Sequence, residues 1–319
     1  MKHLNQFITE YIIKKKLEKP IDSEDHYDYY PKTKDKLIEN LNELISKDIY
    51  DFNCIDTSSI TDMSHLFDMS LKKLIKYSLK NVNFNISEWD VSNVENMEYM
   101  FYGCKKFDAN LSKWNVSNVK DINNMFCLCS DFRGKGLENW DVSKVNIMNG
   151  LFYYCTNFNC DLSGWDVSNV KNMDYIFSNC IVFDYKSIEN WNVSNVTNME
   201  NMFSNCNNFD CDLSKWNVSN VKNMSHMFIN CKNFNCDVSN WDVSKVENMK
   251  AVFYGCNSFI GKGLENWDVS NVENMEYMFY DCKKLNCNLS KWNTSKVEDM
   301  TLMFYNCDSL KNKPSWYKE

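Results

Sequence analysis

A repeat of 25 or 26 residues dominates this sequence and constrains its fold more than any other feature. The unit WDVSNVENMEYMFYGCKKFDANLSK begins at Trp89 and recurs so that nine copies occupy residues 86–312. A single copy could not bury a Trp, a Phe, a Met and a Cys by itself, whereas stacked copies bury each of them against its equivalent. The sequence therefore predicts a solenoid, a chain wound into stacked coils.

We number each repeat from its Trp, which is position 0. Val holds position 2 (Thr294 in one copy), Ser position 3, Val position 5, Phe position 12 and Cys position 15. These constant apolar positions predict the structural core, which consists of Trp89, Trp114, Trp140, Trp165, Trp191, Trp216, Trp241, Trp267, Trp292, Phe101, Phe126, Phe152, Phe177, Phe203, Phe228, Phe253, Phe279, Phe304, Cys104, Cys155, Cys180, Cys206, Cys231, Cys256 and Cys282.

Two periodicities are superposed in each copy. Leu162, Trp165 and Val167 have the spacing of a leucine-rich-repeat strand, with apolar side chains pointing inward. Positions 8, 11, 12 and 15 form one face of a short helix, and Asn or Asp at position 7 could cap it. The predicted fold class is an α/β solenoid, leucine-rich-repeat-like, with one parallel strand and one short helix per coil, about ten coils and an N-terminal helical cap.

The domain prediction follows the repeat. Amphipathic patterns predict helices over residues 4–18 and 34–46, and residues 54–67 align with the repeat as a degenerate first coil in which Ile55 replaces Trp. We therefore expect an N-terminal helical segment and cap (1–50), a degenerate coil with an insertion (51–85), nine repeats (86–312) and a C-terminal tail (313–319). The cap would cover the apolar end of the stack.

Composition excludes several classes of function. The net charge of −8 and the lack of a basic stripe argue against nucleic acid as a partner. Nine of the fifteen cysteines share one apolar repeat position, which favours buried reduced thiols over disulfides. The remaining Cys and the four scattered His lack zinc-ligand spacing, so we expect no metal and no cofactor.

The N-terminus lacks the apolar core of a signal peptide, and no stretch is apolar enough for a transmembrane segment. We therefore expect a soluble, intracellular or virion-associated protein, with a surface location only through non-standard export.

The run W-D-V-S-N-V-x-N-M-x-x-M-F-x-x-C-x-x-F resembles the BspA-like leucine-rich repeats, also called the bacterial surface protein 26-residue repeat and found in mycoplasma lipoproteins. The resemblance covers residues from the lead-in segment PKTKDKLIENLNELI to the last repeat. It implies a surface or virion protein that binds host proteins or mediates adhesion. Unlike exported members, this chain shows neither a signal peptide nor a lipobox Cys.

Two sets of residues are candidates for a partner-binding surface. Outward positions next to the Trp form a polar row: Asp90, Asn115, Asp141, Asp166, Asn192, Asn217, Asp242, Asp268 and Asn293. This row is either a recognition surface or a set of turn-forming groups that remain solvated. The residues on the predicted helix side vary between copies and include Tyr99, Tyr175 and Tyr277, which either bind a partner or pack between neighbouring coils.

The repeat itself argues against catalysis, because nearly every carboxylate or Ser is a copy of one in the next coil, whereas a catalytic site needs polar groups in unique positions. We expect a non-enzymatic scaffold for protein–protein interaction or adhesion, with a protein partner of unknown identity. The alternative is a structural or assembly component that self-associates through the solenoid ends. A solenoid hydrolase is a remote alternative.

Overall fold

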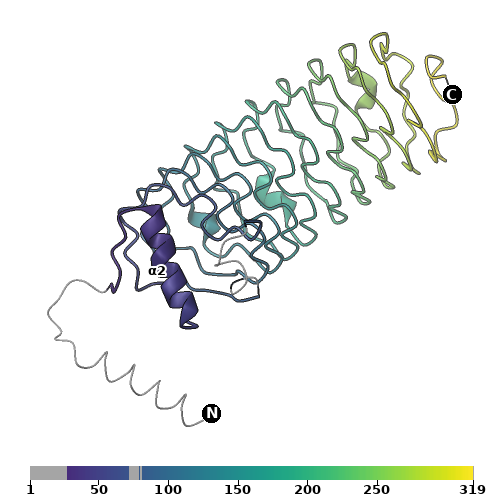
Figure 1. Cartoon of the computed structure of the whole chain (residues 1–319). Helices are drawn as coiled ribbons and strands as arrows, with labels where there is room; N and C mark the ends of the chain where they lie inside the picture. Colours follow the sequence, from purple (N-terminus) through teal and green to yellow (C-terminus); the bar gives the residue numbers. More distant parts are fainter. Residues whose placement is uncertain (1–26, 72–78, 80, 319) are drawn as a thin grey trace.

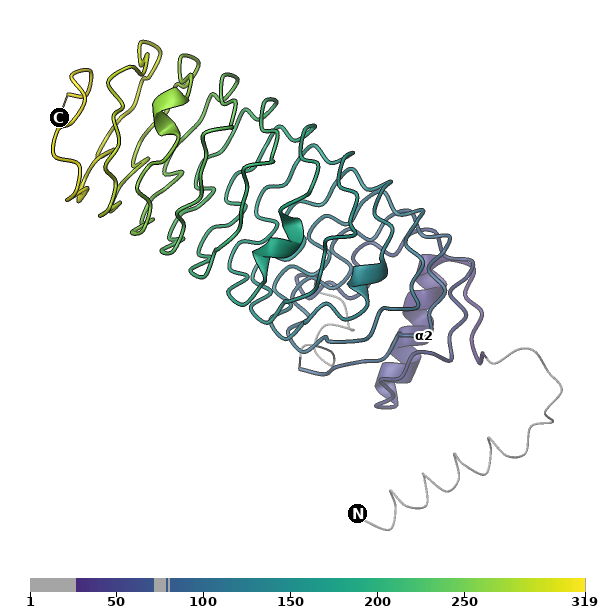
Figure 2. The same ribbon diagram turned by 180° about the vertical axis from the view of Figure 1, so that it is seen from behind.

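The computed structural model describes residues 27–71, 79 and 81–318. Successive coils lie side by side along one axis, from the end that carries helix α2 to the C-terminal end (Figure 1), and the reverse view shows the same order (Figure 2). Regular secondary structure in the described part consists of α2 (Lys34–Ser46) and three short 3-10 helices, η1 (Leu137–Asn139), η2 (Tyr185–Ile188) and η3 (Leu264–Asn266).

The prediction of one strand per coil is wrong. Among the described residues, pairing between coils is limited to isolated parallel bridges, nearly all at position 7, such as the one between Asn198 and Asn223. The segment around each Trp contains tight turns instead, because the N–H of Trp216 donates to the carbonyl of Leu213, three residues earlier (3.1 Å). These turns direct the apolar side chains inward without a paired strand, so the spacing that suggested a strand did not require one.

The prediction of one helix per coil is also wrong. In the coil that begins at Trp191, the N–H groups at positions 8, 10, 12 and 14 donate to the carbonyls at positions 7, 9, 11 and 13 of the next coil, at 2.8–2.9 Å. The N–H groups at positions 11, 13 and 15 donate to the carbonyl three residues earlier, as Cys206 does to Phe203 (3.1 Å). From position 10 to position 15, N–H groups therefore alternate between binding the next coil and binding within their own coil.

Left-handed residues are the physical reason that no helix forms. Positions 10 and 14 have positive φ in all nine copies, for example Asn201 (54°) and Asn205 (62°). Such a residue reverses the peptide orientation, so a helix cannot continue through it. Three-residue turns also return every third or fourth side chain to the same side, which explains why the apolar spacing imitated a helix. The architecture is therefore a stack of turn-built coils rather than an α/β fold.

One continuous hydrophobic core runs through the stack and contains all the Trp, Phe and Cys residues of the predicted core. The Phe rings at position 12 stack from coil to coil, with centroids 6.0 Å apart between Phe177 and Phe203 and 5.5 Å apart between Phe203 and Phe228. The Trp rings are also parallel, with Trp140 and Trp165 inclined by 1°. Each coil therefore buries its aromatic residues mainly against the equivalent residues of its neighbours.

Trp and Cys also supply hydrogen bonds along the stack. The indole N–H of Trp216 donates to the carbonyl of Ile188 (3.2 Å), and the thiol of Cys206 donates to the carbonyl of Phe177 (3.2 Å), both in the preceding coil. The same thiol bond forms at position 15 of every copy, and we call these nine residues the thiol ladder. All fifteen cysteines are free thiols. Burial raises the pKa of Cys206 to about 12.

The predicted helix over residues 34–46 is confirmed as α2. Thr33 caps it by accepting a hydrogen bond from the N–H of Lys36 (3.2 Å), and its buried face joins the core through Leu37, Leu41 and Leu44. The predicted helix over residues 4–18 lies outside the described residues, and the division into four segments remains a prediction.

Candidate functional site

The polar row predicted next to the Trp residues is exposed, but its side chains have a local structural role. The Oδ1 atom of Asp166 accepts the N–H of Ser168 at 3.0 Å, and the same bond forms in all nine copies. Hydrogen bonds from the side chain and N–H of Ser143 lower the pKa of Asp141. These bonds account for the constant Ser through turn formation.

A second surface is formed by side chains at positions 10, 13 and 14. We call it the tyrosine face, and it comprises Tyr99, Tyr102, Tyr153, Tyr154, Tyr175, Tyr254, Tyr277, Tyr280 and Tyr305. The three predicted residues are half-buried there: the Tyr99 ring lies 5.3 Å from Tyr102, Tyr175 lies 5.5 Å from Tyr153, and Tyr277 lies 5.8 Å from Tyr280. The structure also adds His65, which stacks on Tyr99 at 4.9 Å and was not predicted.

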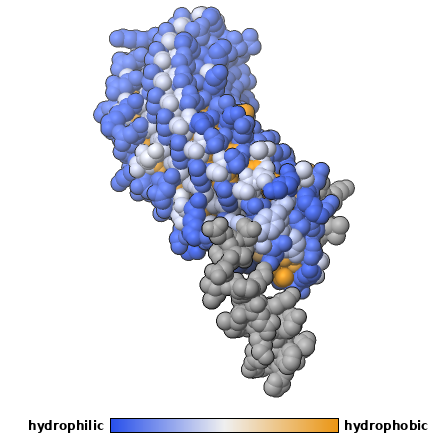
Figure 3. Space-filling view, turned by 90° about the vertical axis from the view of Figure 1, so that its left-hand side faces the viewer, coloured by the Kyte–Doolittle hydropathy of each residue, from blue (hydrophilic) through white to orange (hydrophobic). Residues whose placement is uncertain are grey.

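The C-terminal group of this face is the most regular. The rings of Tyr254 and Tyr280 are parallel at 4.7 Å, and Tyr305 stacks on Tyr280 at 4.8 Å. Tyr305 is 48% exposed. The side of the molecule seen in Figure 3 is largely hydrophilic, with only small separate hydrophobic spots. The tyrosine face therefore supplies aromatic contact area, while aliphatic side chains such as Ile181, Val182 and Ile260 are also exposed.

Polar groups lie between the tyrosine clusters. Desolvation raises the pKa of the half-buried Asp174 and lowers that of His226, with Glu200 close enough to influence both. One oxygen of Asp174 and the Nδ1 atom of His226 have no hydrogen-bond partner within the described ranges. No group of three or more His, Cys, Asp or Glu residues in the described chain could hold a metal ion.

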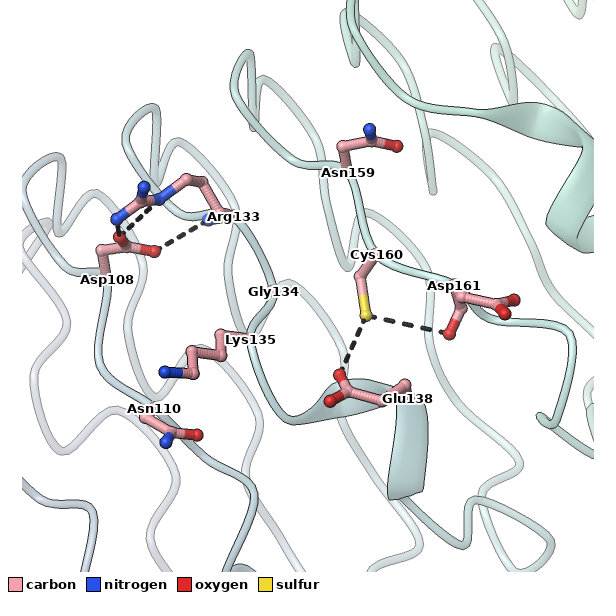
Figure 4. Close-up of a pocket in the computed structure, with 9 residues that line it drawn as sticks. All are labelled: Asp108, Asn110, Arg133, Gly134, Lys135, Glu138, Asn159, Cys160 and Asp161. Carbon is pink, nitrogen blue, oxygen red and sulfur yellow. Dashed lines mark hydrogen bonds and ion pairs between the residues drawn. The ribbon is translucent and has the colours of Figure 1, made fainter.

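A third feature is a hollow of about 600 Å³ on the edge that carries the Gly134-Lys135-Gly136 loop (Figure 4). It is lined by Asp108, Asn110, Arg133, Gly134, Lys135, Glu138, Asn159, Cys160 and Asp161. The guanidinium of Arg133 pairs with Asp108, its Nε donating at 2.7 Å. In Figure 4 the ammonium of Lys135 points toward Asn110 and away from this ion pair.

The acidic groups of the hollow are largely engaged. Glu138 accepts the N–H of Gly136 (2.8 Å) and the thiol of Cys160 (3.5 Å), while Asp161 accepts the N–H of Ser163 (2.9 Å). Burial raises the pKa of Cys160 to about 12, so this thiol is not an activated nucleophile. No site was predicted in the Gly134-Lys135-Gly136 loop from the sequence. The Gly-Lys-Gly run was the available signal.

The comparisons with known proteins establish the family. A family described as "Mycoplasma protein of unknown function, DUF285" matches residues 35–136, 129–240 and 224–318. The chain belongs to this family. Because the three matches run from residue 35 to residue 318, the family covers the helix α2 and all nine repeats. No curated protein and no solved structure matches the chain. No helix within the described ranges has the length and apolar character needed to cross a membrane.

Proposed function

We propose that this chain is a non-enzymatic, BspA-like scaffold that binds a protein partner through its tyrosine face. The observation that carries this proposal is the backbone conformation of Tyr99, Tyr175 and Tyr277. They occupy position 10 with φ of 54°, 57° and 56°, where the other coils have Gly150, Asn124, Asn201, His226, Ala251 and Leu302. Left-handed backbone costs a residue other than Gly, Asn or Asp about 1–2 kcal/mol. A strained Tyr at three such positions suggests that its side chain is retained for function.

The arrangement of the rings suits protein binding. Tyr supplies a large contact area with an exposed hydroxyl group and is enriched at protein interfaces. The parallel packing of Tyr254 on Tyr280 already orders these side chains, so less conformational entropy would be lost on binding. Adhesion is one such binding role and is consistent with the BspA-like resemblance.

Catalysis has little support in the polar row or in the buried thiols. The carboxylates of the polar row repeat from coil to coil and accept backbone N–H groups, and the thiols have raised pKa values, as for Cys180 and Cys206. None of these groups is an activated acid, base or nucleophile in a unique position. We therefore propose a binding role without enzymatic activity.

The test begins by placing a photoreactive benzoylphenylalanine at residue 280, on the tyrosine face, and in a second protein at residue 242, on the polar row. A cross-linked protein that appears from residue 280 and not from residue 242 is purified as the candidate partner. Its affinity is then measured by calorimetry against the wild type and against the Tyr175→Asn, Tyr277→Asn double variant.

We expect the double variant to be at least as stable as the wild type, because Asn tolerates left-handed backbone, and to bind the partner about tenfold or more weakly. The Tyr50→Asn variant, which changes a Tyr near α2, is the matched control and should bind normally. Equal binding by the double variant, cross-linking only from residue 242, or no specific cross-link from residue 280 would each contradict the proposal.

A further inference from the structure

The chain contains two copies of the Gly-Lys-Gly loop, one around Lys135 and one around Lys262. Gly134 and Gly136 in the first loop have φ of 85° and 100°, and Gly261 and Gly263 in the second have φ of 87° and 93°. An added Cβ at Gly136 would lie 2.2 Å from the backbone of the preceding coil, and at Gly263 it would lie 2.3 Å away. Both loops therefore have the same rigid backbone around their Lys. The surroundings of Lys135 can be compared directly with those of Lys262.

In the second loop the Lys has a carboxylate partner. The ammonium of Lys262 lies 2.7 Å from the Oδ2 atom of Asp237, while the Oδ1 atom of Asp237 accepts the N–H of Ser239 at 3.0 Å. The hydrogen bond from Lys262 is the main cause that lowers the pKa of Asp237 to about 2. The loop and this Asp are thus a complete ion pair within the chain.

In the first loop the equivalent residue is Asn110. Its Oδ1 atom accepts the N–H of Ser112 at 3.1 Å, so it forms the same turn as Asp237 but offers an amide where Asp237 offers a carboxylate oxygen. Lys135 forms no ion pair with any described residue, although it lines the hollow next to Asn110 (Figure 4). The Lys135 ammonium and the Asn110 side chain thus line a hollow at the place where the other loop has the Asp237 carboxylate.

We propose that the hollow is a binding site for a carboxylate, whose oxygens bind Lys135 and the Asn110 amide as the Asp237 carboxylate binds Lys262. A carboxylate fits better than a phosphate dianion, because the site supplies one unpaired cation and lies beside the carboxylates of Glu138 and Asp161. The site involves no residue of the tyrosine face, so it goes beyond the proposed function. The carboxylate has two possible sources, an acidic side chain and a chain terminus.

Three probes separate these sources: N-acetyl-aspartate N-methylamide for a side chain, N-acetylglycine for a terminus, and N-acetyl-asparagine N-methylamide as the uncharged control. The lysines are reductively dimethylated with ¹³C, which keeps their charge, and observed by NMR during titration. The Lys135 signal is assigned from its loss in Lys135→Gln. We expect a saturable shift of this signal with at least one carboxylate probe and none with the control. The carboxylate probe that shifts it at the lower concentration identifies the source.

Two exchanged variants test the assignment. Asn110→Asp gives the first loop its own carboxylate and should weaken probe binding at Lys135 by about tenfold or more. Asp237→Asn frees Lys262 and should create a second saturable site there. Asn110 and Asp237 are both partly exposed and occupy equivalent positions in the turns of two different coils. An unchanged unfolding midpoint in each variant would show that the fold is retained. The proposal would be overturned if the shift of the Lys135 signal did not saturate or if it persisted in Asn110→Asp. It would also be overturned if Asp237→Asn produced no saturable shift of the Lys262 signal.

Discussion

Replacing Gly255 with Ala tests the turn structure of the coils, because a turn and a helix predict changes of opposite sign in the free energy of unfolding. Gly255 has φ of 70°, and an added Cβ would lie 2.7 Å from the Oδ1 atom of Asn230. Left-handed backbone costs a residue with a Cβ about 1–2 kcal/mol. In the opposite direction, replacing Gly with Ala stabilises the folded protein by about 0.4–1 kcal/mol, because the unfolded chain has less conformational entropy. We expect the free energy of unfolding to fall by about 1 kcal/mol. In a helix it would rise by about 1 kcal/mol.

Gly164→Ala is the matched control for this substitution. Its φ lies outside the left-handed region, and the nearest atom to an added Cβ is the carbonyl oxygen of Glu138 at 3.8 Å. Ala should therefore stabilise this site by about 0.4–1 kcal/mol. Urea titrations followed by Trp fluorescence give both values. If Gly255→Ala raised the unfolding midpoint as Gly164→Ala does, the left-handed conformation at position 14 would be refuted.

Three further predictions concern the core, the thiols and the N-terminal end. Phe203→Ala should lower the free energy of unfolding by about 3–5 kcal/mol in a urea titration, and a loss below about 1 kcal/mol would contradict its place in the ring stack. Mass spectrometry after iodoacetamide treatment at pH 8 should find the thiol ladder unmodified. Burial raises the pKa of the half-buried Cys236 and Cys287 to about 12, so these thiols should react slowly at pH 8 and more rapidly as the pH is raised. Leu41→Ala should lower stability by about 2–5 kcal/mol and promote self-association, whereas an unchanged midpoint would make α2 a tether rather than a cap.

The repeat could be read from the sequence, but the backbone that it adopts could not be read from apolar spacing alone. The inward positions of Trp216 and Phe203 follow from burial, and burial does not distinguish a helix from consecutive turns. The distinguishing signal was at position 14, where Gly, Asn or Asp stands in seven of the nine copies. These residues favour left-handed backbone, and two such positions per coil are incompatible with a helix.

The candidate sites show a similar limit. A turn-forming role for the polar row could be offered as an alternative from the sequence because an Asx side chain with Ser two residues later is a local pattern, complete within one coil. The hollow depends instead on which residues of neighbouring coils meet. The comparison of Lys135 and Asn110 with Lys262 and Asp237 needs the register of four coils, which the structure supplies. The stacking of equivalent core residues was predictable from the repeat, but the pairing of particular polar side chains in neighbouring coils was not.

The bonds that hold the stack together leave the tyrosine face free to vary. Coils are joined by backbone groups, by the indole of Trp216 and by the thiol of Cys206, all of which point along or into the stack. The side chain at position 10 contributes to none of these ladders, so Tyr277 can differ from its equivalent Asn201 without loss of a backbone, indole or thiol hydrogen bond between coils. Substitutions on this face should therefore change binding without unfolding the protein, which is why the stability of the Tyr277→Asn variant and its affinity for a partner can be measured as independent quantities.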